Sequence, residues 1–181
     1  MVHSGDKVGS LRDIPAAGAL PTRVAFLLIE DFALMSYASV IEPFRAANRL
    51  SGQPLYEWYH MSVDGQPVRP STGITMHVDG AIDGNLEIDM ILVCAGANPA
   101  TFDHRPTFAA LRKLSARGIT IGGVSGGAFL LARAGLLDGY RCTIHWEHEP
   151  AFLETFPNLD FVRGLFVIDR RRITCAGGTA G

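Results

Sequence analysis

Continuously apolar runs alternate with segments of helical periodicity along most of this chain. Residues 23–29 and 88–94 are apolar with few breakers, which is typical of strands buried on both faces of a parallel sheet. Residues 36–50 repeat apolar positions at helical spacing and end at a Ser-Gly breaker, so they predict a helix. The same pattern predicts further strands at 56–63, 74–78, 119–124 and 141–144, further helices at 106–117, 126–134 and 147–156, and a hairpin of 165–168 with 172–175.

This alternation predicts one α/β domain built on a mainly parallel sheet with helices on both faces. In sheets of that kind, ligands bind outside the carboxyl ends of the strands, at the point where the strand order reverses. We therefore expect the functional residues in the loops that follow Ile29, Cys94, Val124 and Ile144.

The sharpest local motif is Gly123-Val-Ser-Gly-Gly127, a G-x-S-x-G pattern between a predicted strand and a predicted helix. Small neighbours let the backbone turn sharply, so Ser125 would project at the strand end, and the free N–H groups that begin with Gly126 would face the same spot. Such a turn can hold an oxyanion in an enzyme or a bound carboxylate in a receptor. A tight turn with a helix-capping serine fits the pattern equally well.

His145 follows a predicted strand and is expected on the same rim as Ser125, where it could act as a general base. An orienting carboxylate could come from any of three acids, none of which the spacing singles out: Asp138, Glu147 and Glu149. His145 and His148 also have a spacing that metal ligands use. No further ligand pattern accompanies them, so we expect no metal site.

Aromatic and acidic residues gather on the segments expected to converge at the cleft. Phe32 and Tyr37 lie just after the first strand, and Trp146 lies at a later strand end. Acids close by in sequence are Glu30, Asp31 and Glu147. An aromatic face with acids nearby favours a bound cation, at about 0.5–2 kcal/mol per cation–π contact. The alternative is that the aromatic side chains pack the core and the acids face water.

Composition narrows the function classes. The 181 residues carry a net charge of -2 at pH 7 and no basic excess, so this segment alone is not expected to grip DNA. We expect no membrane contact, because no apolar run is long enough for a span and no secretion signal is recognisable. Three cysteines without CxxC spacing indicate a reducing, cytoplasmic setting. Residues 1–21 predict a disordered tail and residues 22–181 the domain. Arginines 170–172 predict a solvated hairpin tip.

Several longer motifs resemble a known family. The strings V-A-F-L-L-I, I-E-P-F-R-A-A-N-R-L, G-G-V-S-G-G-A-F-L-L-A-R-A-G-L-L-D-G, T-I-H-W-E-H and F-V-I-D-R-R-R-I-T-C-A-G-G-T-A resemble the N-terminal domain of GlxA-type AraC/XylS-family transcriptional regulators. That domain belongs to the PfpI/ThiJ group of class I glutamine amidotransferase-like folds. The resemblance covers residues 23–181, is most specific over 122–146, and implies a flavodoxin-like sheet.

Enzymes of the wider superfamily place a cysteine at the elbow, a carboxylate beside it, and a histidine from a later strand. By this resemblance Ser125 stands at the elbow, Ser36 stands about where the carboxylate should be, and His145 matches the histidine. A serine lacks the availability of a thiolate and needs a strong base to act near neutral pH. With the carboxylate also changed, we expect a vestigial site and no enzymatic activity.

In the regulators, the resemblance implies, the same cleft binds a small-molecule effector without a cofactor. Together with the aromatic and acidic residues, it favours a betaine, carnitine or basic amino acid. The expected ligand contacts are Phe32, Ser36, Tyr37, Ser125, Gly126, His145 and Trp146. The resemblance also implies a homodimer that binds DNA through C-terminal helix-turn-helix units absent from this sequence. The N-cap-like Gly-Gly-Thr179 predicts a further helix beyond Gly181.

Two other functions stay open. A small serine hydrolase or amidase could use Ser125 and His145, and the G-x-S-x-G match favours it, although the chain is short for a full α/β-hydrolase. A non-catalytic scaffold or dimerisation module is the third candidate.

Overall fold

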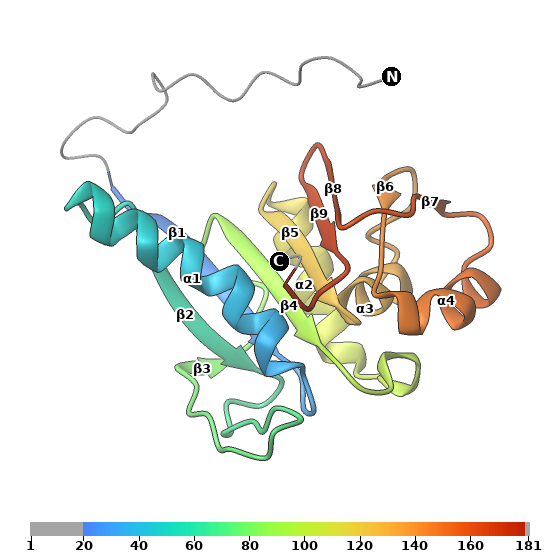
Figure 1. Ribbon diagram of the computed structural model, residues 1–181, viewed down its shortest axis with the longest axis horizontal. Coiled ribbons are helices and arrows are strands. Elements are labelled where there is room, and N and C mark those ends of the chain that lie inside the picture. Colours follow the sequence, from blue (N-terminus) through green and yellow to red (C-terminus); the bar gives the residue numbers. More distant parts are fainter. Residues whose placement is uncertain (1–19, 180–181) are drawn as a thin grey trace.

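A seven-stranded sheet in the order β3-β2-β1-β4-β5-β9-β8 forms the centre of the computed structural model (Figure 1). The model describes residues 20–179, so residues 1–19 of the predicted tail lie outside it. The strands are β1 (Thr22–Leu28), β2 (Tyr56–Ser62), β3 (Gly80–Ala81), β4 (Met90–Ala95), β5 (Thr120–Ser125), β8 (Phe166–Asp169) and β9 (Arg172–Cys175). All neighbours pair in parallel except β8 and β9, which form the predicted antiparallel hairpin.

The strand order reverses between β1 and β4. From β1 the chain adds β2 and β3 on one side, whereas β4, β5 and β9 lie on the other. Leu28 pairs with Cys94, so the loops after these two strands leave the sheet at the same level. A crevice at such a reversal is the place where open α/β sheets bind ligands.

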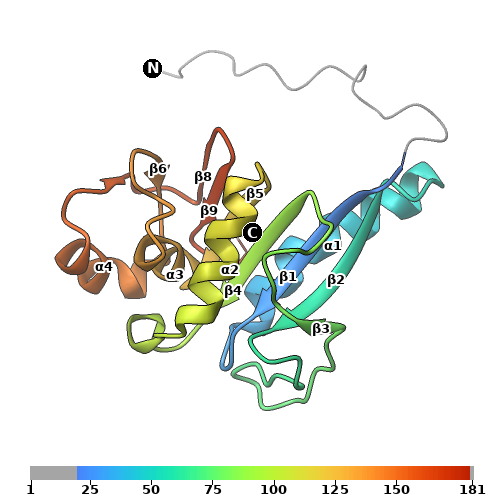
Figure 2. The same ribbon diagram turned by 180° about the vertical axis from the view of Figure 1, so that it is seen from behind.

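Helices cover both faces of the sheet, as predicted. Helix α1 (Leu34–Ser51) lies on one face, and α2 (Arg105–Ala116) and α3 (Gly127–Arg133) lie on the other (Figures 1 and 2). Alternate residues of a strand point to opposite faces, so β1 contributes to two cores. Phe26 packs in the core beneath α1, and Leu27 packs in the core beneath α2 and α3. No helix within residues 20–179 is both long and apolar enough to cross a membrane.

Two predicted strands differ from the structure. The strand expected at 74–78 is reduced to one antiparallel bridge between Val68 and Met76, because the chain turns tightly at Pro70 and Gly73 and meets no further strand. The strand expected at 141–144 stops early, since the Thr143 N–H donates to the Thr174 hydroxyl (2.9 Å). The remaining elements are β6 (Arg141–Cys142), which pairs with β7 (Asp160–Phe161), the short turns η2 (Pro99–Thr101) and η3 (Trp146–His148), and α4 (Glu149–Thr155).

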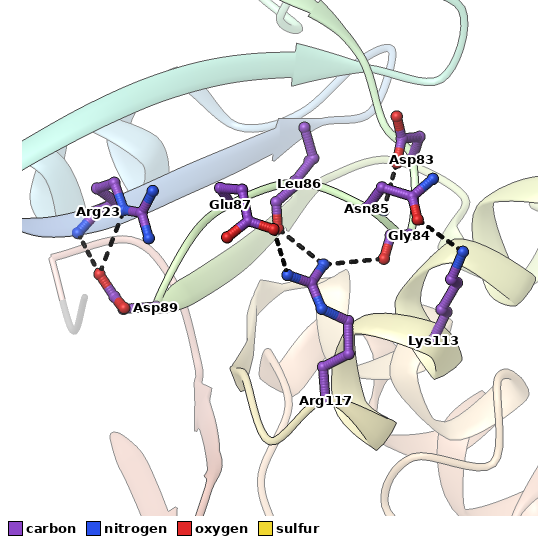
Figure 3. Close-up of polar contacts among 9 residues, drawn as sticks. All are labelled: Arg23, Asp83, Gly84, Asn85, Leu86, Glu87, Asp89, Lys113 and Arg117. Carbon is purple, nitrogen blue, oxygen red and sulfur yellow. Dashed lines mark hydrogen bonds and ion pairs between the residues drawn. The ribbon is translucent and has the colours of Figure 1, made fainter.

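The segment of residues 83–89 leads into β4 and is fixed by Arg117, which directly follows α2, and by Arg23 of β1 (Figure 3). Arg117 donates to the carbonyl oxygens of Gly84 (3.0 Å) and Leu86 (2.9 Å) and to the Glu87 carboxylate (2.8 Å). The backbone N–H of Arg23 donates to Asp89 (2.8 Å). These contacts hold the amino ends of β1 and β4 together, at the edge of the sheet opposite the expected site.

Arg172 is buried, so the predicted solvated tip is wrong for this residue. Its Nε donates to the Leu136 carbonyl (2.6 Å) and its Nη2 to the Ser115 hydroxyl (2.7 Å). The guanidinium also lies 4.6 Å from the centre of the Tyr140 ring. Buried arginines need such partners, because a guanidinium that leaves water without them is strongly destabilising.

Candidate functional site

Ser125 ends β5 in a left-handed backbone conformation, with φ of 56°, and α3 begins two residues later. The predicted strand-to-helix turn is therefore present. It depends on glycine at position 127, because a Cβ there would collide with the carbonyl of Val93. The N–H of Gly126 donates to the carbonyl of Ala95 (3.0 Å). In a serine hydrolase the N–H after the nucleophile serves the oxyanion, whereas here it is bonded to the neighbouring strand.

Gly177 covers the elbow serine. Its φ is +75°, and a Cβ added to it would lie 2.6 Å from the Ser125 Cβ and 2.9 Å from the Ser36 Oγ. The next residue, Gly178, donates its N–H to the Ser36 Oγ (2.7 Å). Ser36 and Ser125 thus meet across one glycine. Ser125 is only 4% exposed, so its hydroxyl presents little surface to a substrate.

Cys175 is a neighbour of the elbow that the sequence did not single out. Burial raises the pKa of its thiol, while hydrogen bonds from the backbone of Gly177 and Ser125 oppose that shift. Cys94 lies on the same core face, two strands away, and burial raises its pKa as well. Both thiols stay protonated and unreactive near neutral pH.

His145 does not form a catalytic couple with Ser125. Its Nδ1 accepts the N–H of Glu147 (3.3 Å), so the imidazole caps the η3 turn. Its ring packs at 5.5 Å from the ring of Trp146 and 5.8 Å from that of His148. Among the described residues, no hydrogen bond joins His145 to Ser125, which a general base would need in order to take the hydroxyl proton.

The three predicted aromatic contacts lie in different environments. Phe32 has no exposed surface and packs edge-on against Tyr37, with 5.7 Å between ring centroids. The hydroxyl of Tyr37 pairs with Nε2 of His60 (2.7 Å), and burial raises the pKa of Tyr37 to about 12. Trp146 is 74% exposed. Phe32 and Tyr37 therefore pack in the core, which was the alternative that the sequence left open.

A cavity of about 360 Å³ opens at the reversal of strand order. The loop after β1 supplies Glu30 and Asp31 to its lining, and the loop after β4 supplies Asn98 and Pro99. The loops approach so closely that a Cβ on Gly96 would collide with the Asp31 carbonyl. The expectation that function lies after Ile29 and Cys94 corresponds to this place, and Glu30 and Asp31 were the acids considered for a cation.

The segment after β2 closes the cavity and carries lining residues that sequence reasoning missed: Ser62, Asp64, Gln66 and Val68. No motif marks this segment. Only its position could have indicated it, because it follows a parallel strand next to the point where the strand order reverses. Asp64 adds a third carboxylate to the lining, and its carboxylate accepts the N–H of Gln66 (3.0 Å). The cavity is therefore acidic, with aromatic surface from Phe102.

A second group of polar side chains lies on the η3 turn. His145, Glu147 and His148 each offer one donor atom, and these atoms lie within 4.8 Å of one another. Burial lowers the pKa of His148; Glu147 and the backbone of Gly96 raise it, and His145 lowers it. The turn therefore faces the loop after β4 through His148. The sequence spacing pointed to the two histidines, but it gave no sign that Glu147 would lie beside them.

Comparison with known proteins places this arrangement in a family. The model of the DJ-1/PfpI family matches residues 22–181. The transcriptional regulator GlxA of Rhizobium meliloti, an HTH-type protein, is 46% identical over 159 residues, which are 87% of this chain and 49% of the relative. The HTH-type regulator GbdR of Pseudomonas aeruginosa is 41% identical over 167 residues, or 92% of this chain and 46% of the relative. The chain thus spans about half the length of these curated relatives.

Solved structures agree. The crystal structure of an AraC family transcriptional regulator from Pseudomonas putida matches with a TM-score of 0.77 and 30% identity, covering 88% of this chain and 86% of that one. A ThiJ/PfpI domain protein from Brachyspira murdochii matches with a TM-score of 0.74, 17% identity and coverage of 88% and 90%, which supports the fold. The chain belongs to the DJ-1/PfpI family, and its similarity to HTH-type transcriptional regulators extends over nearly the whole described domain.

Proposed function

We propose that this domain is the effector-sensing part of a cytoplasmic, dimeric AraC-type transcriptional regulator and that it catalyses no reaction. DNA binding belongs, in this proposal, to a part of the protein beyond the present sequence. The similarity to HTH-type regulators over about half their length supports a regulatory role. The segment's net charge of -2 argues against DNA binding by the segment itself.

The observation that carries the sensing role is the acidic cavity at the strand reversal. Three carboxylates line it, from Glu30, Asp31 and Asp64, and Phe102 adds an aromatic face. Carboxylates and an aromatic ring suit a cationic or zwitterionic metabolite such as a betaine, carnitine or basic amino acid. Its volume of about 360 Å³ matches small-ligand sites.

The predicted contact residues take a supporting role in this proposal. Phe32 follows Asp31 directly and anchors the loop in the core, while Tyr37 and Ser36 hold the start of α1. Gly126 lies under the loop that lines the cavity, since a Cβ on it would be 3.0 Å from Pro99. A ligand that draws the acidic loops together would therefore also shift the elbow at Ser125 and the turn that follows it.

Calorimetry tests the sensing role. Wild-type protein is titrated with glycine betaine, carnitine and arginine, and with 3,3-dimethylbutanoate, in which carbon replaces the betaine nitrogen. We expect a cationic ligand to bind and the neutral-headed isostere to bind far more weakly. Glu30→Gln and Asp64→Asn should each lower the affinity about tenfold, the equivalent of about 1.4 kcal/mol. The exposed Glu154→Gln on α4 is the control. Equal binding of the isostere, or no binding of any ligand, would refute the proposal.

A serine hydrolase is the second candidate, because Ser125 has the strained φ of 56° typical of a nucleophile elbow. Its covered hydroxyl and the bonded N–H of Gly126 argue against that activity. Incubation with a fluorophosphonate separates the two functions. We expect no adduct on Ser125 by mass spectrometry, and a stoichiometric adduct that Ser125→Ala abolishes would establish the hydrolase instead.

A further inference from the structure

The η3 turn brings together three side chains whose donor atoms suit a transition metal. Two imidazoles and one carboxylate come from four consecutive positions, His145 to His148, and all three donor atoms lie within 4.8 Å of one another. Nδ1 of His145 lies 3.9 Å from Oε2 of Glu147. The clustering follows from the tight turn, which reverses the chain so that residues two and three positions apart share one side.

These separations are near those that a metal ion imposes. Zinc binds histidine nitrogen at about 2.0–2.1 Å and carboxylate oxygen at similar length, so two ligands of a tetrahedral site lie roughly 3.4 Å apart. Zinc at Nδ1 of His145 would replace the long bond that this nitrogen accepts from the Glu147 N–H (3.3 Å), and closing 3.9 Å to that value needs a small side-chain rotation. Glu147 can make it, because its side chain is 67% exposed and free to turn about several bonds. The His145 side chain is 23% exposed and is held by the turn.

His148 is oriented by the protein rather than by solvent. It is half-buried and faces the backbone of Gly96 in the loop after β4. Metal-binding histidines commonly donate one ring N–H to a carbonyl, which fixes the ring and leaves the other nitrogen for the ion. The turn itself is anchored by α4, which starts at Glu149 and has Pro150 in its first turn.

We propose that His145, Glu147 and His148 form a Zn²⁺ site with three protein ligands and one open position. Two imidazole nitrogens with one carboxylate favour zinc over Mg²⁺ or Ca²⁺, which prefer all-oxygen ligand sets. The open position faces solvent, where water or an anionic group of a small molecule completes the tetrahedron. A bound ion would fix the η3 turn against the loop after β4, which also lines the acidic cavity. The site does not depend on the proposed effector.

Metal titration of the whole chain, freed of any histidine tag, tests the site. Zinc affinity is measured by competition with a chromophoric chelator, and Co²⁺ supplies a visible spectrum that reports tetrahedral coordination. We expect one equivalent to bind, with His148→Ala and Glu147→Gln each weakening zinc at least about tenfold. The control is His77→Ala, which removes an exposed imidazole elsewhere. Circular dichroism confirms that each variant is folded.

Three results would overturn the proposal. One is a wild-type dissociation constant in the millimolar range or weaker. Another is an affinity that His148→Ala and Glu147→Gln leave unchanged. The third is an equal loss in His77→Ala, since binding would then arise from surface histidines in general. Effector binding without zinc leaves the sensing role intact, so the two proposals fail separately.

Discussion

Gly177 and Ser125 are in such close contact that a Cβ added to the glycine would lie 2.6 Å from the Cβ of the serine. The glycine also has a φ of +75°, which side-chain-bearing residues rarely adopt. The chain after β9 can therefore cross the elbow only without a side chain at this position. The same crossing that hides the serine hydroxyl places the Gly178 N–H on Ser36.

Gly177→Ala should destabilise the protein by about 2–4 kcal/mol, because it combines the left-handed backbone penalty with a collision inside a packed site. The matched control is Gly178→Ala. Gly178 also has a positive φ, +63°, but no atom of residues 20–179 lies within 4 Å of the added Cβ. We expect it to cost only about 1–2 kcal/mol. Urea unfolding measures both, and equal losses would mean that the contact with Ser125 contributes nothing.

Arg172→Lys should lower the free energy of unfolding by about 2 kcal/mol. A lysine cannot reach the Leu136 carbonyl and the Ser115 hydroxyl together, so one buried acceptor loses its partner. Arg171→Lys is the control, because Arg171 is exposed and contacts only the surface carbonyl of Gly118 among the bonds described. Thermal and urea unfolding give the two values. A loss in Arg171→Lys as large as in Arg172→Lys would contradict the role assigned to burial.

The sheet could be predicted from sequence because its strands are apolar on both faces. Residues 23–29 and 88–94 have no polar alternation to confuse them, and both became central strands within two residues of the predicted bounds. The strand predicted at 74–78 was wrong for a different reason. It has suitable residues, but strand formation also needs a partner, which local sequence does not reveal.

The position of the cavity could be predicted, but its lining could not. The cavity lies at the strand ends after Ile29 and Cys94, which position alone marked as places to look for function. The environments of Phe32 and Trp146 could not be deduced, because both follow strands and only the packing of α1 and η3 buries one and exposes the other. Asp64 was missed because a loop acid has no distinguishing pattern until the fold turns it toward a cavity.

Acid should weaken the fold through His60. Burial lowers the pKa of His60 below its ordinary value, and Asp79, whose carboxylate lies 3.7 Å from Nδ1, opposes the shift. The unfolded chain therefore takes up a proton at a higher pH than the folded one. Stability is complete above about pH 6.5 and is lost as the pH falls through the folded-state pKa. His60→Gln retains an acceptor for the Tyr37 hydroxyl but does not titrate.

Urea unfolding of both proteins at about pH 7.5 and about pH 5.5 checks this sign. The variant should lose less stability on acidification than the wild type. A residual loss remains, because burial lowers the pKa of His148 in the same direction. If the two proteins lose the same amount, the proton uptake does not take place at His60.

Arg117→Ala should release the segment before β4. Arg117 bonds two backbone carbonyls, of Gly84 and Leu86, and the Glu87 carboxylate (Figure 3). Its removal leaves the carbonyls to water and should cost about 1–2 kcal/mol, with faster amide hydrogen exchange over residues 83–89. Lys113→Ala is the control, because that lysine makes one exposed bond to Asn85 (2.7 Å) and should cost less than about 1 kcal/mol. Exchange in residues 83–89 that is as slow as in the wild type would show that α2 holds the segment by packing alone.

Because these contacts lie at the amino ends of the strands, we also expect effector affinity at the opposite edge to stay unchanged in Arg117→Ala. A lower affinity in this variant would reveal coupling between the two edges.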